Sequence, residues 1–237
     1  MAAGRSIWIT RAQPGADATA ARLRDLGHEP VIAPLLSVRD LSPIIDLDGV
    51  GALAFSSANG VRAFAKLSPE RGLRAFAVGA ATAEAAKAAG FTGVLSADGD
   101  VDALAAAIAA RGREIGGIVL HAAAAQPAGD LVGALGAAGV SALAVAVYET
   151  VVEKPGKTLL DALGDIDLVL VHSPRAAKAL APILGRQPAP RLRALCISRA
   201  AAAPLKAPQA KGKLGGVAFA PFPIETALLN LIDRQPD

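Results

Sequence analysis

The chain has 237 residues, of which 53% are hydrophobic and 3% aromatic, and this is enough apolar material for one large packed domain or two small ones. Its 24 basic and 21 acidic residues give a net charge of only +3, which argues against nucleic-acid binding because such surfaces carry a basic stripe or cluster. The single cysteine, Cys196, excludes an internal disulfide, and no segment has the roughly 18–20 consecutive apolar residues of a membrane span.

The N-terminal residues lead directly into a predicted strand and lack a cleavable signal, so we expect a cytoplasmic protein. From there, apolar runs alternate with Ala-rich helical stretches, a pattern typical of βαβ units with parallel strands buried on both faces. The predicted strands are Ser6–Thr10, Pro30–Pro34, Ala52–Ser56, Ala75–Val78, Gly93–Leu95, Gly117–Leu120, Ala142–Val147, Asp167–Val171, Arg193–Ile197 and Gly216–Phe219. The predicted helices are Asp17–Leu26, Gly60–Leu67, Thr82–Ala89, Asp102–Ala110, Asp130–Ala138, Arg175–Leu184 and Ile224–Leu231.

Two segments interrupt this alternation. Leu35–Asp48 has no helical period, and Val145–Lys157 is long, β-branched and ends in Pro-Gly. We interpret both as extended linkers that divide the chain into an opening βαβ unit, a middle block and a final block.

Two strand-to-helix turns repeat along the chain. Ser57 and Ser173 are 116 residues apart, and Val78 and Ile197, in the strands that follow, are 119 apart. The nearly equal spacings predict a duplicated domain.

Polar residues gather where the predicted strands end and helices begin, which is where α/β proteins hold anionic ligands. Ser56, Ser57 and Asn59 follow the third strand; one of them suffices to cap the helix, so we expect the others to bind a carboxylate. Gly60 allows a close backbone approach or a positive φ. Gly79 and Thr82 end the next strand as a weaker motif of the same kind.

Three further side chains each have two interpretations. Arg11, after Thr10 at the end of the first strand, either clamps a carboxylate bidentately or is an exposed loop residue. His121 and His172 close apolar strands, where a ligand would lie, but they are also ordinary residues for such positions.

Tyr148 is the only tyrosine and lies at the second linker. It is either a packing residue or, at a hinge between domains, a weak general acid.

The sequence argues against several kinds of binding and catalytic site. The densest basic group, Arg62, Lys66, Arg71 and Arg74, is interpreted as a solvated helix face and not as a phosphate track. There is no dinucleotide-binding glycine motif, P-loop, serine-hydrolase elbow or metal-ligand spacing. We therefore expect no metal and no other cofactor.

The ordered motifs resemble one known family. They are ITR at 9–11, FSSANGV at 55–61, AVGAATA at 77–83, Tyr148, HSPRAA at 172–177, CIS at 196–198 and the closing P-x-x-x-x-x-x-L from Pro221. In order and spacing, over nearly the whole chain, they resemble the uroporphyrinogen-III synthases, cofactor-free enzymes of tetrapyrrole synthesis. FSSANGV with the following AVG-x-x-TA is the most specific part.

The resemblance implies an α/β fold of two similar parallel-sheet domains, flavodoxin-like or Rossmann-like, joined by a two-stranded linker with the substrate in a cleft between them. Residues 1–34 and 153–237 would form the discontinuous first domain, and 49–144 the second. Residues 35–48 and 145–152 would be the linker strands. It further implies a monomer that meets hydroxymethylbilane synthase transiently and binds neither nucleic acid nor membrane.

The resemblance also implies the reaction. Linear hydroxymethylbilane loses its terminal hydroxyl to give an azafulvene and closes through a spiro intermediate into uroporphyrinogen III, with inversion of the last pyrrole ring. The substrate supplies its own nucleophilic carbons, so the protein orients it, assists departure of hydroxide and excludes the faster closure without inversion. The residues implied are Tyr148 as the acid and, for substrate binding, Thr10, Arg11, Ser56, Ser57, Asn59, Gly60, Gly79, Thr82, His172, Ser173 and Ser198.

Three positions depart from the family pattern. The usual Thr-Ser of the first turn is Ser56-Ser57 here. The turn after Leu120 lacks the frequent Arg-Gly pair, so a carboxylate contact is either missing or replaced by His121 or Gln126. The final block offers only Ser198 where a Thr is common near Ala201.

Two other functions compete with this interpretation. The first alternative is a non-catalytic two-domain binding protein for a small polyanionic ligand. A nucleotide-sugar transferase with paired Rossmann-like domains is disfavoured, because the chain is short and has no diphosphate-binding glycine loop.

Overall fold

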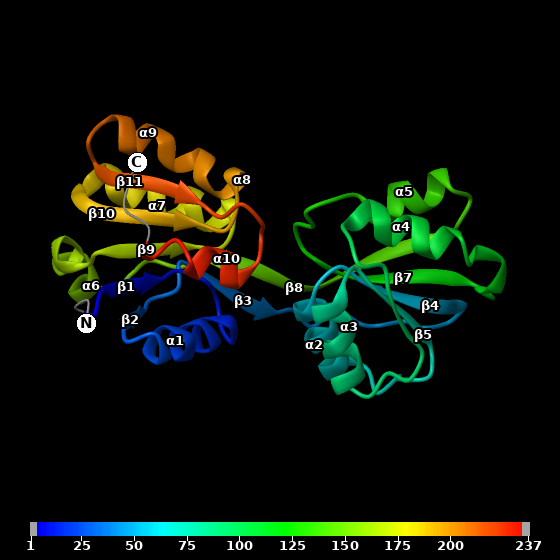
Figure 1. The fold of residues 1–237 in the computed structure, drawn as a ribbon. Helices are drawn as coiled ribbons and strands as arrows, with labels where there is room; N and C mark the ends of the chain where they lie inside the picture. The colour runs from blue at the N-terminus through cyan, green and yellow to red at the C-terminus, as the bar shows by residue number, and fades with distance from the viewer. Residues whose placement is uncertain (1–3, 234–237) are drawn as a thin grey trace. The chain divides into compact units, whose positions relative to one another are not determined.

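The computed structural model describes residues 4–233, which form two compact units. Residues up to Ser37 and from Val151 onward form unit 1, and Val38–Thr150 form unit 2. Each unit is a sheet with helices packed on it (Figure 1). None of the helices within residues 4–233 is long and apolar enough to cross a membrane.

Unit 1 contains a five-stranded sheet in the order β11-β10-β9-β1-β2, and all its neighbouring pairs are parallel. Its strands are β1 (Ser6–Ile9), β2 (Glu29–Ile32), β9 (Leu168–Val171), β10 (Ala189–Cys196) and β11 (Leu214–Phe219). Its helices are α1 (Gly15–Asp25), α6 (Lys157–Asp161), α7 (Pro174–Arg186), α8 (Arg199–Ala202), α9 (Lys206–Ala210) and α10 (Glu225–Leu229), with 3₁₀ turns η2 (Leu163–Asp165) and η3 (Ala203–Leu205).

The two faces of this sheet are covered by different helices. Ile7 and Ile9 of β1 pack with α1 and α10, whereas Trp8 points to the other face and packs with α7 and α8. Successive residues of a strand point to opposite faces, so a continuous apolar run serves both layers.

Unit 2 is built around a six-stranded sheet in the order β3-β8-β7-β4-β5-β6. Its strands are β3 (Leu36–Asp40), β4 (Val50–Phe55), β5 (Arg74–Ala77), β6 (Val94–Ser96), β7 (Ile118–Ala124) and β8 (Ala142–Val152). Its helices are α2 (Ala58–Leu67), α3 (Ala80–Ala88), α4 (Val101–Ala109) and α5 (Leu131–Ala137), with the 3₁₀ turn η1 (Gly112–Glu114). Helices α2 and α3 pack on one face, and α4 and α5 pack on the other.

Strands β3 and β8 carry the chain across the unit boundary. The backbone N–H of Leu41 donates to Val147 and that of Glu153 donates to Leu35, so residue numbers rise along β3 as they fall along β8. The pair is therefore antiparallel, whereas β7–β8, β4–β7, β4–β5 and β5–β6 are parallel.

The α/β class with mostly parallel sheets is confirmed, and the predicted strands and helices are all present with shifted ends. Within the segment predicted as an extended linker strand, residues 36–40 form β3, which joins the six-stranded sheet beside β8. The short helices α6, α8 and α9 were not predicted. With four or five residues each, they have no helical period to recognise.

The densest basic group is not simply a solvated helix face. The Arg71 guanidinium donates to four backbone carbonyls, those of Ala65, Ser68, Glu70 and Ala89, and lies 5.0 Å from the centre of the Phe91 ring. Arg71 therefore satisfies free carbonyls near the ends of α2 and α3, as a cation at a helix C-terminus can.

Candidate functional site

In unit 2, polar side chains lie at the carboxyl ends of neighbouring strands. Ser57 follows β4 and is the N-cap of α2, with its Oγ accepting from the Gly60 N–H at 3.2 Å. Thr82 lies in the first turn of α3, after β5. Tyr148 comes from β8, beyond β7.

The Ser57 Oγ and the Tyr148 hydroxyl are 2.8 Å apart. The Tyr148 ring belongs to the buried cluster with Phe55 and Val61, and the residue is only 7% exposed. Packing therefore fixes the ring, and the cap fixes the Ser57 oxygen that meets its hydroxyl. The packing role considered for Tyr148 and a polar role are thus compatible.

Beside this pair, the Ser56 Oγ is 2.9 Å from Nε2 of His121. Burial lowers the pKa of His121 from 6.5 to about 4, because the apolar surroundings disfavour the charged ring. His121 is therefore neutral at pH 7 and supplies no positive charge for a carboxylate, the role considered for it at the altered turn after Leu120.

Gly60 has a steric role at this site. A Cβ at this position would lie 2.5 Å from the carbonyl oxygen of Ala122 in β7 and 3.8 Å from Cε1 of Tyr148. Only glycine lets α2 approach β7 this closely without a backbone shift.

The remaining predicted residues of unit 2 lie at the same strand ends without joining this hydrogen-bonded group. Asn59 Oδ1 accepts from Arg62, and Thr82 is buried. Gly79 is extended, and a Cβ there would meet nothing within 4 Å, so sterics do not require glycine.

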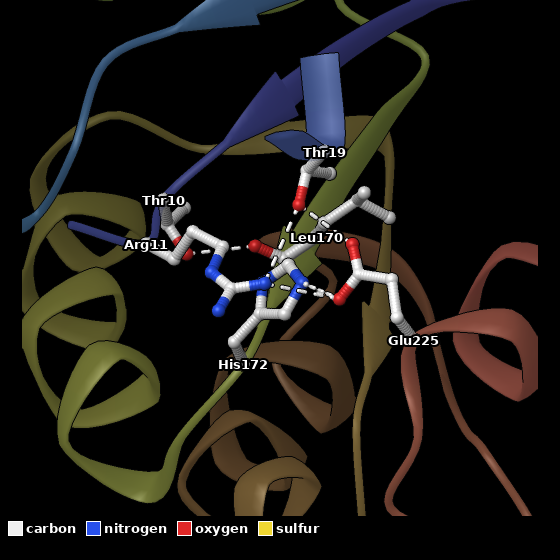
Figure 2. Close-up of polar contacts among 6 residues, drawn as sticks. All are labelled: Thr10, Arg11, Thr19, Leu170, His172 and Glu225. Carbon is white, nitrogen blue, oxygen red and sulfur yellow. Dashed lines mark hydrogen bonds and ion pairs between the residues drawn. The ribbon is translucent and has the colours of Figure 1, made fainter. Parts of the chain in front are cut away.

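In unit 1, the strand ends converge on a carboxylate, that of Glu225 (Figure 2). Nη1 of Arg11 lies 3.1 Å from Oε2 of Glu225, and Nε2 of His172 lies 3.0 Å from the same oxygen. The Thr19 hydroxyl donates to Oε1 at 2.6 Å. We call these four residues, Arg11, Thr19, His172 and Glu225, the carboxylate cluster.

The environment of Glu225 favours its ionised form. Its pKa is lowered to about 2. Burial alone would raise this pKa, but the hydrogen bonds from His172 and Thr19 and the charges of His172 and Arg11 outweigh it. Since an ionised carboxylate only accepts, Nε2 of His172 is the donor.

Arg11 is therefore neither the free clamp nor the simple exposed residue considered from the sequence. Only its Nη1 has hydrogen-bond partners among residues 4–233, namely Glu225 and Thr19. The guanidinium also lies against Gly15, where a Cβ would be 2.5 Å from Nε. Nε and Nη2 have no hydrogen-bond partner among residues 4–233, and Gly15 lies against this same edge, where a Cβ would also be 2.7 Å from Nη2. The side chain as a whole is 36% exposed.

Three other predicted residues of unit 1 make local bonds. Thr10 is fully buried, and its hydroxyl donates to the Leu170 carbonyl at 2.7 Å, tying the end of β1 to β9. Ser173 Oγ accepts from the Ala176 N–H at 3.1 Å as the cap of α7, and Ser198 Oγ accepts from Ala201 at 3.2 Å as the cap of α8.

Sequence reasoning missed Glu225, Thr19 and the bonding role of His121. Glu225 begins the last helix after a Pro-rich turn, and an acid at a helix N-terminus is normally explained by the helix dipole alone. Thr19 lies within α1 and has no motif around it. Thr19 and Glu225 lie 8 and 214 positions from Arg11 in the sequence, and only the folded chain brings their side chains to it.

Among residues 4–233, no group of three or more His, Cys, Asp or Glu side chains is arranged to hold a metal ion. Cys196 is buried, and burial raises its pKa to about 12. It packs in the core and is unsuited to act as a thiolate.

The comparisons with known proteins point to one family over most of the chain. The family model described as "Uroporphyrinogen-III synthase HemD" matches residues 17–212. The fold is similar to that of uroporphyrinogen-III synthetase from Helicobacter pylori 26695, with a TM-score of 0.68, 18% identity and coverage of 96% of this chain and 97% of that one. It is also similar to a mutant uroporphyrinogen III synthase from Thermus thermophilus, with a TM-score of 0.56, 19% identity and 96% coverage of both chains. No curated protein matches significantly.

Proposed function

The chain belongs to the uroporphyrinogen-III synthase family, and from this premise we propose that Tyr148, hydrogen-bonded to Ser57, is the general acid of its reaction. The protein is a hydro-lyase of porphyrin and haem biosynthesis that closes hydroxymethylbilane into uroporphyrinogen III, inverting the last pyrrole ring. The family match does not favour the alternative of a non-catalytic binding protein.

The reaction begins when the substrate loses its terminal hydroxyl. Hydroxide is a poor leaving group, so a proton delivered to the departing oxygen lowers the barrier. The carbon–carbon bond is then formed by the substrate's own pyrroles. The protein therefore needs a proton donor and groups that hold the polycarboxylate in shape.

The Ser57–Tyr148 contact carries the proposal. One lone pair of Ser57 Oγ already accepts from the Gly60 N–H. If Ser57 donates its own proton to the Tyr148 oxygen, the phenol proton is free to point at the leaving hydroxyl. The same hydrogen bond stabilises the phenolate that remains after proton transfer.

For substrate binding we propose the strand-end groups of both units. Arg11 would contact a carboxylate through its unpaired Nε and Nη2, and Ser56 would do so through the hydroxyl that is paired with His121. Helix N-termini and hydroxyls can bind several carboxylates without a large positive net charge, which agrees with the balance of +3. The other proposed contacts are Thr10, Ser57, Asn59, Gly60, Gly79, Thr82, His172, Ser173 and Ser198.

We also propose that the protein works as a cytoplasmic monomer and takes its substrate from hydroxymethylbilane synthase in a transient contact. Direct transfer is useful because the linear substrate closes spontaneously without inversion. The family's action on hydroxymethylbilane supports this proposal.

The test is Tyr148→Phe with enzymatically made hydroxymethylbilane as substrate. Loss of the phenol proton should lower kcat by about 100-fold or more, since a general acid typically contributes about 10²–10⁴-fold. The unfolding midpoint should change little, because the ring stays packed in the Phe55 cluster. Leu143→Thr, an exposed change in the same strand, is the matched control.

The product isomer decides the function itself. Wild-type protein should give isomer III, whereas isomer I alone would match spontaneous closure and reject the enzyme. Isomer III from the wild type, with unchanged kcat in a folded Tyr148→Phe variant, would remove Tyr148 from the acid role only.

A further inference from the structure

Glu225 is the common partner of three side chains from different elements of unit 1. Arg11 follows β1, Thr19 lies in α1 and His172 follows β9. Glu225 is an unspecified position of the closing motif that starts at Pro221, and the proposed chemistry does not use it.

The geometry at Arg11 leaves one edge of the guanidinium unused. Arg has five N–H donors in a planar fork, and a carboxylate is best bound by two parallel donors of one edge. Glu225 engages only Nη1. The edge formed by Nε and Nη2 has no hydrogen-bond partner among residues 4–233, and the residue against it, Gly15, has no side chain. This edge could therefore receive a second carboxylate while the first contact is kept.

A free Arg side chain samples many rotamers, and each one lost on binding costs free energy. The contact with Glu225 has already restricted Arg11 before a ligand arrives. Glu225 is in turn restrained by Thr19 at Oε1 and by His172 at Oε2. Within the carboxylate cluster, Glu225 is therefore held in place by Thr19 and His172 and in turn restrains the Arg11 guanidinium.

We propose that Glu225 is a positioning residue that orients the Arg11 guanidinium, so that its unpaired Nε and Nη2 bind a carboxylate of hydroxymethylbilane. This inference rests on the proposed function, because it takes Arg11 as a substrate contact. Glu225 itself touches no reacting atom.

A competing explanation is that Glu225 occupies the substrate's place and must leave. Its contacts argue against this, because displacement would break the bonds to Arg11, Thr19 and His172 together. Nδ1 of His172 is buried without a partner among residues 4–233, so His172 has no alternative bond ready when Glu225 departs. Positioning and displacement predict opposite changes of KM.

The test is a double-mutant cycle between Glu225→Gln and Arg11→Ala, with KM and kcat for hydroxymethylbilane measured by formation of isomer III. Glu225→Gln keeps the size of the side chain and removes its charge. We expect KM to rise about tenfold, the effect of losing one charge-assisted contact, while kcat changes less than about twofold. In the Arg11→Ala background, Glu225→Gln should raise KM less than about twofold further.

Glu114→Gln is the control, because Glu114 pairs with Arg74 on unit 2 and belongs to no proposed site. Thr19→Val is a second probe that keeps the Glu225 charge and removes only its Oε1 anchor. It should raise KM about threefold, and again only when Arg11 is present. It keeps the proposal testable if Glu225→Gln does not fold.

Three results would overturn the inference. They are an unchanged KM in folded Glu225→Gln, a lowered KM as displacement requires, or an equal rise of KM with and without Arg11. If wild-type protein makes isomer III and one of these results follows, the inference alone fails. If wild-type protein makes no isomer III, the proposed function fails and the inference fails with it.

Discussion

Ser57 in unit 2 and Ser173 in unit 1 cap their helices in almost the same way. Their φ and ψ angles are −161° and 155° at Ser57 and −161° and 156° at Ser173. In each case Oγ accepts from the N–H three residues later, that of Gly60 or of Ala176. The two units therefore use the same backbone geometry at these turns.

The side chains around the two caps are different. Ser57 meets the Tyr148 hydroxyl, and Ser56 meets a histidine that burial keeps neutral. Near Ser173, His172 instead joins Arg11 and an ionised carboxylate. The same turn has become an uncharged hydroxyl pair in one unit and an ion-pair cluster in the other. This difference favours proton transfer for unit 2 and carboxylate binding for unit 1.

Among the changes that distinguish the two caps, Gly60→Ala in unit 2 should have the largest effect on stability and turnover. The corresponding residue after the Ser173 cap is Ala176, which already has a Cβ, whereas a Cβ at Gly60 would lie 2.5 Å from the Ala122 carbonyl oxygen. We expect α2 to shift away from β7 at a cost of about 1–3 kcal/mol. Turnover should fall at least about tenfold, because the Ser57–Tyr148 contact is lost. Urea unfolding and isomer III formation measure the two effects.

Gly185→Ala in α7 is the matched control for that change. A Cβ there would meet nothing within 4 Å, so the variant should be equally or more stable, by up to about 1 kcal/mol. If Gly60→Ala behaves like Gly185→Ala, the close approach of α2 to β7 has no functional importance.

A smaller effect should separate the two caps themselves. Ser57→Ala and Ser173→Ala each lose one cap and should each cost about 1 kcal/mol of stability. Ser57→Ala should also lower kcat about tenfold, because Tyr148 loses its partner, whereas Ser173→Ala should act mainly on KM. Steady-state kinetics and unfolding of the two variants, measured side by side, provide the check. Equal losses of kcat would contradict the assignment of chemistry to unit 2.

The sequence was sufficient for the features that depend on local order. Apolar runs such as Leu168–Val171 and hydroxyls such as Ser57 and Ser173 predicted the strands and caps, because strand burial and capping act over a few residues. Leu36–Asp40 was predicted as part of an extended linker strand, but its place in the six-stranded sheet was not, because it joins that sheet only through its distant neighbour β8.

The carboxylate cluster was hidden for a related reason. Glu225 and Arg11 are 214 positions apart, and no periodicity or motif links them. Their pairing depends on the order of strands in the sheet and on the covering helices, which composition and spacing do not encode. For His121 the apolar run before it predicted a position at the end of a strand, which was wrong, because β7 continues to Ala124 and His121 lies in its middle. Its neutral state follows from burial in the folded chain and was not predicted either.

The smallest expected effect is on the pH dependence of stability. As the pH falls from about 6.5 to about 4, the unfolded chain protonates His121 before the folded chain does, so stability is lost. Glu225 has a lowered pKa too, and its stabilising effect is present above about 4.5 and lost as the pH falls towards about 2. Both groups therefore lower the stability of the folded chain as the pH falls, but they do so over adjacent pH ranges.

Urea unfolding at a series of pH values can separate the two windows. Trp8, the only tryptophan, is buried in unit 1 and reports its unfolding by fluorescence, while circular dichroism follows the whole chain. His121→Asn should remove the loss of unfolding free energy between about pH 6.5 and 4 (the upper window) and keep the loss between about pH 4.5 and 2 (the lower window). Glu225→Gln should remove the second loss and keep the first. Burial causes the lowered pKa of His121, whereas the charge of Arg11 contributes to the lowered pKa of Glu225. Arg11→Ala should therefore bring the pKa of Glu225 closer to its ordinary value and narrow only the lower pH window. A narrowed upper window in Arg11→Ala would show that the two sites are not electrostatically independent.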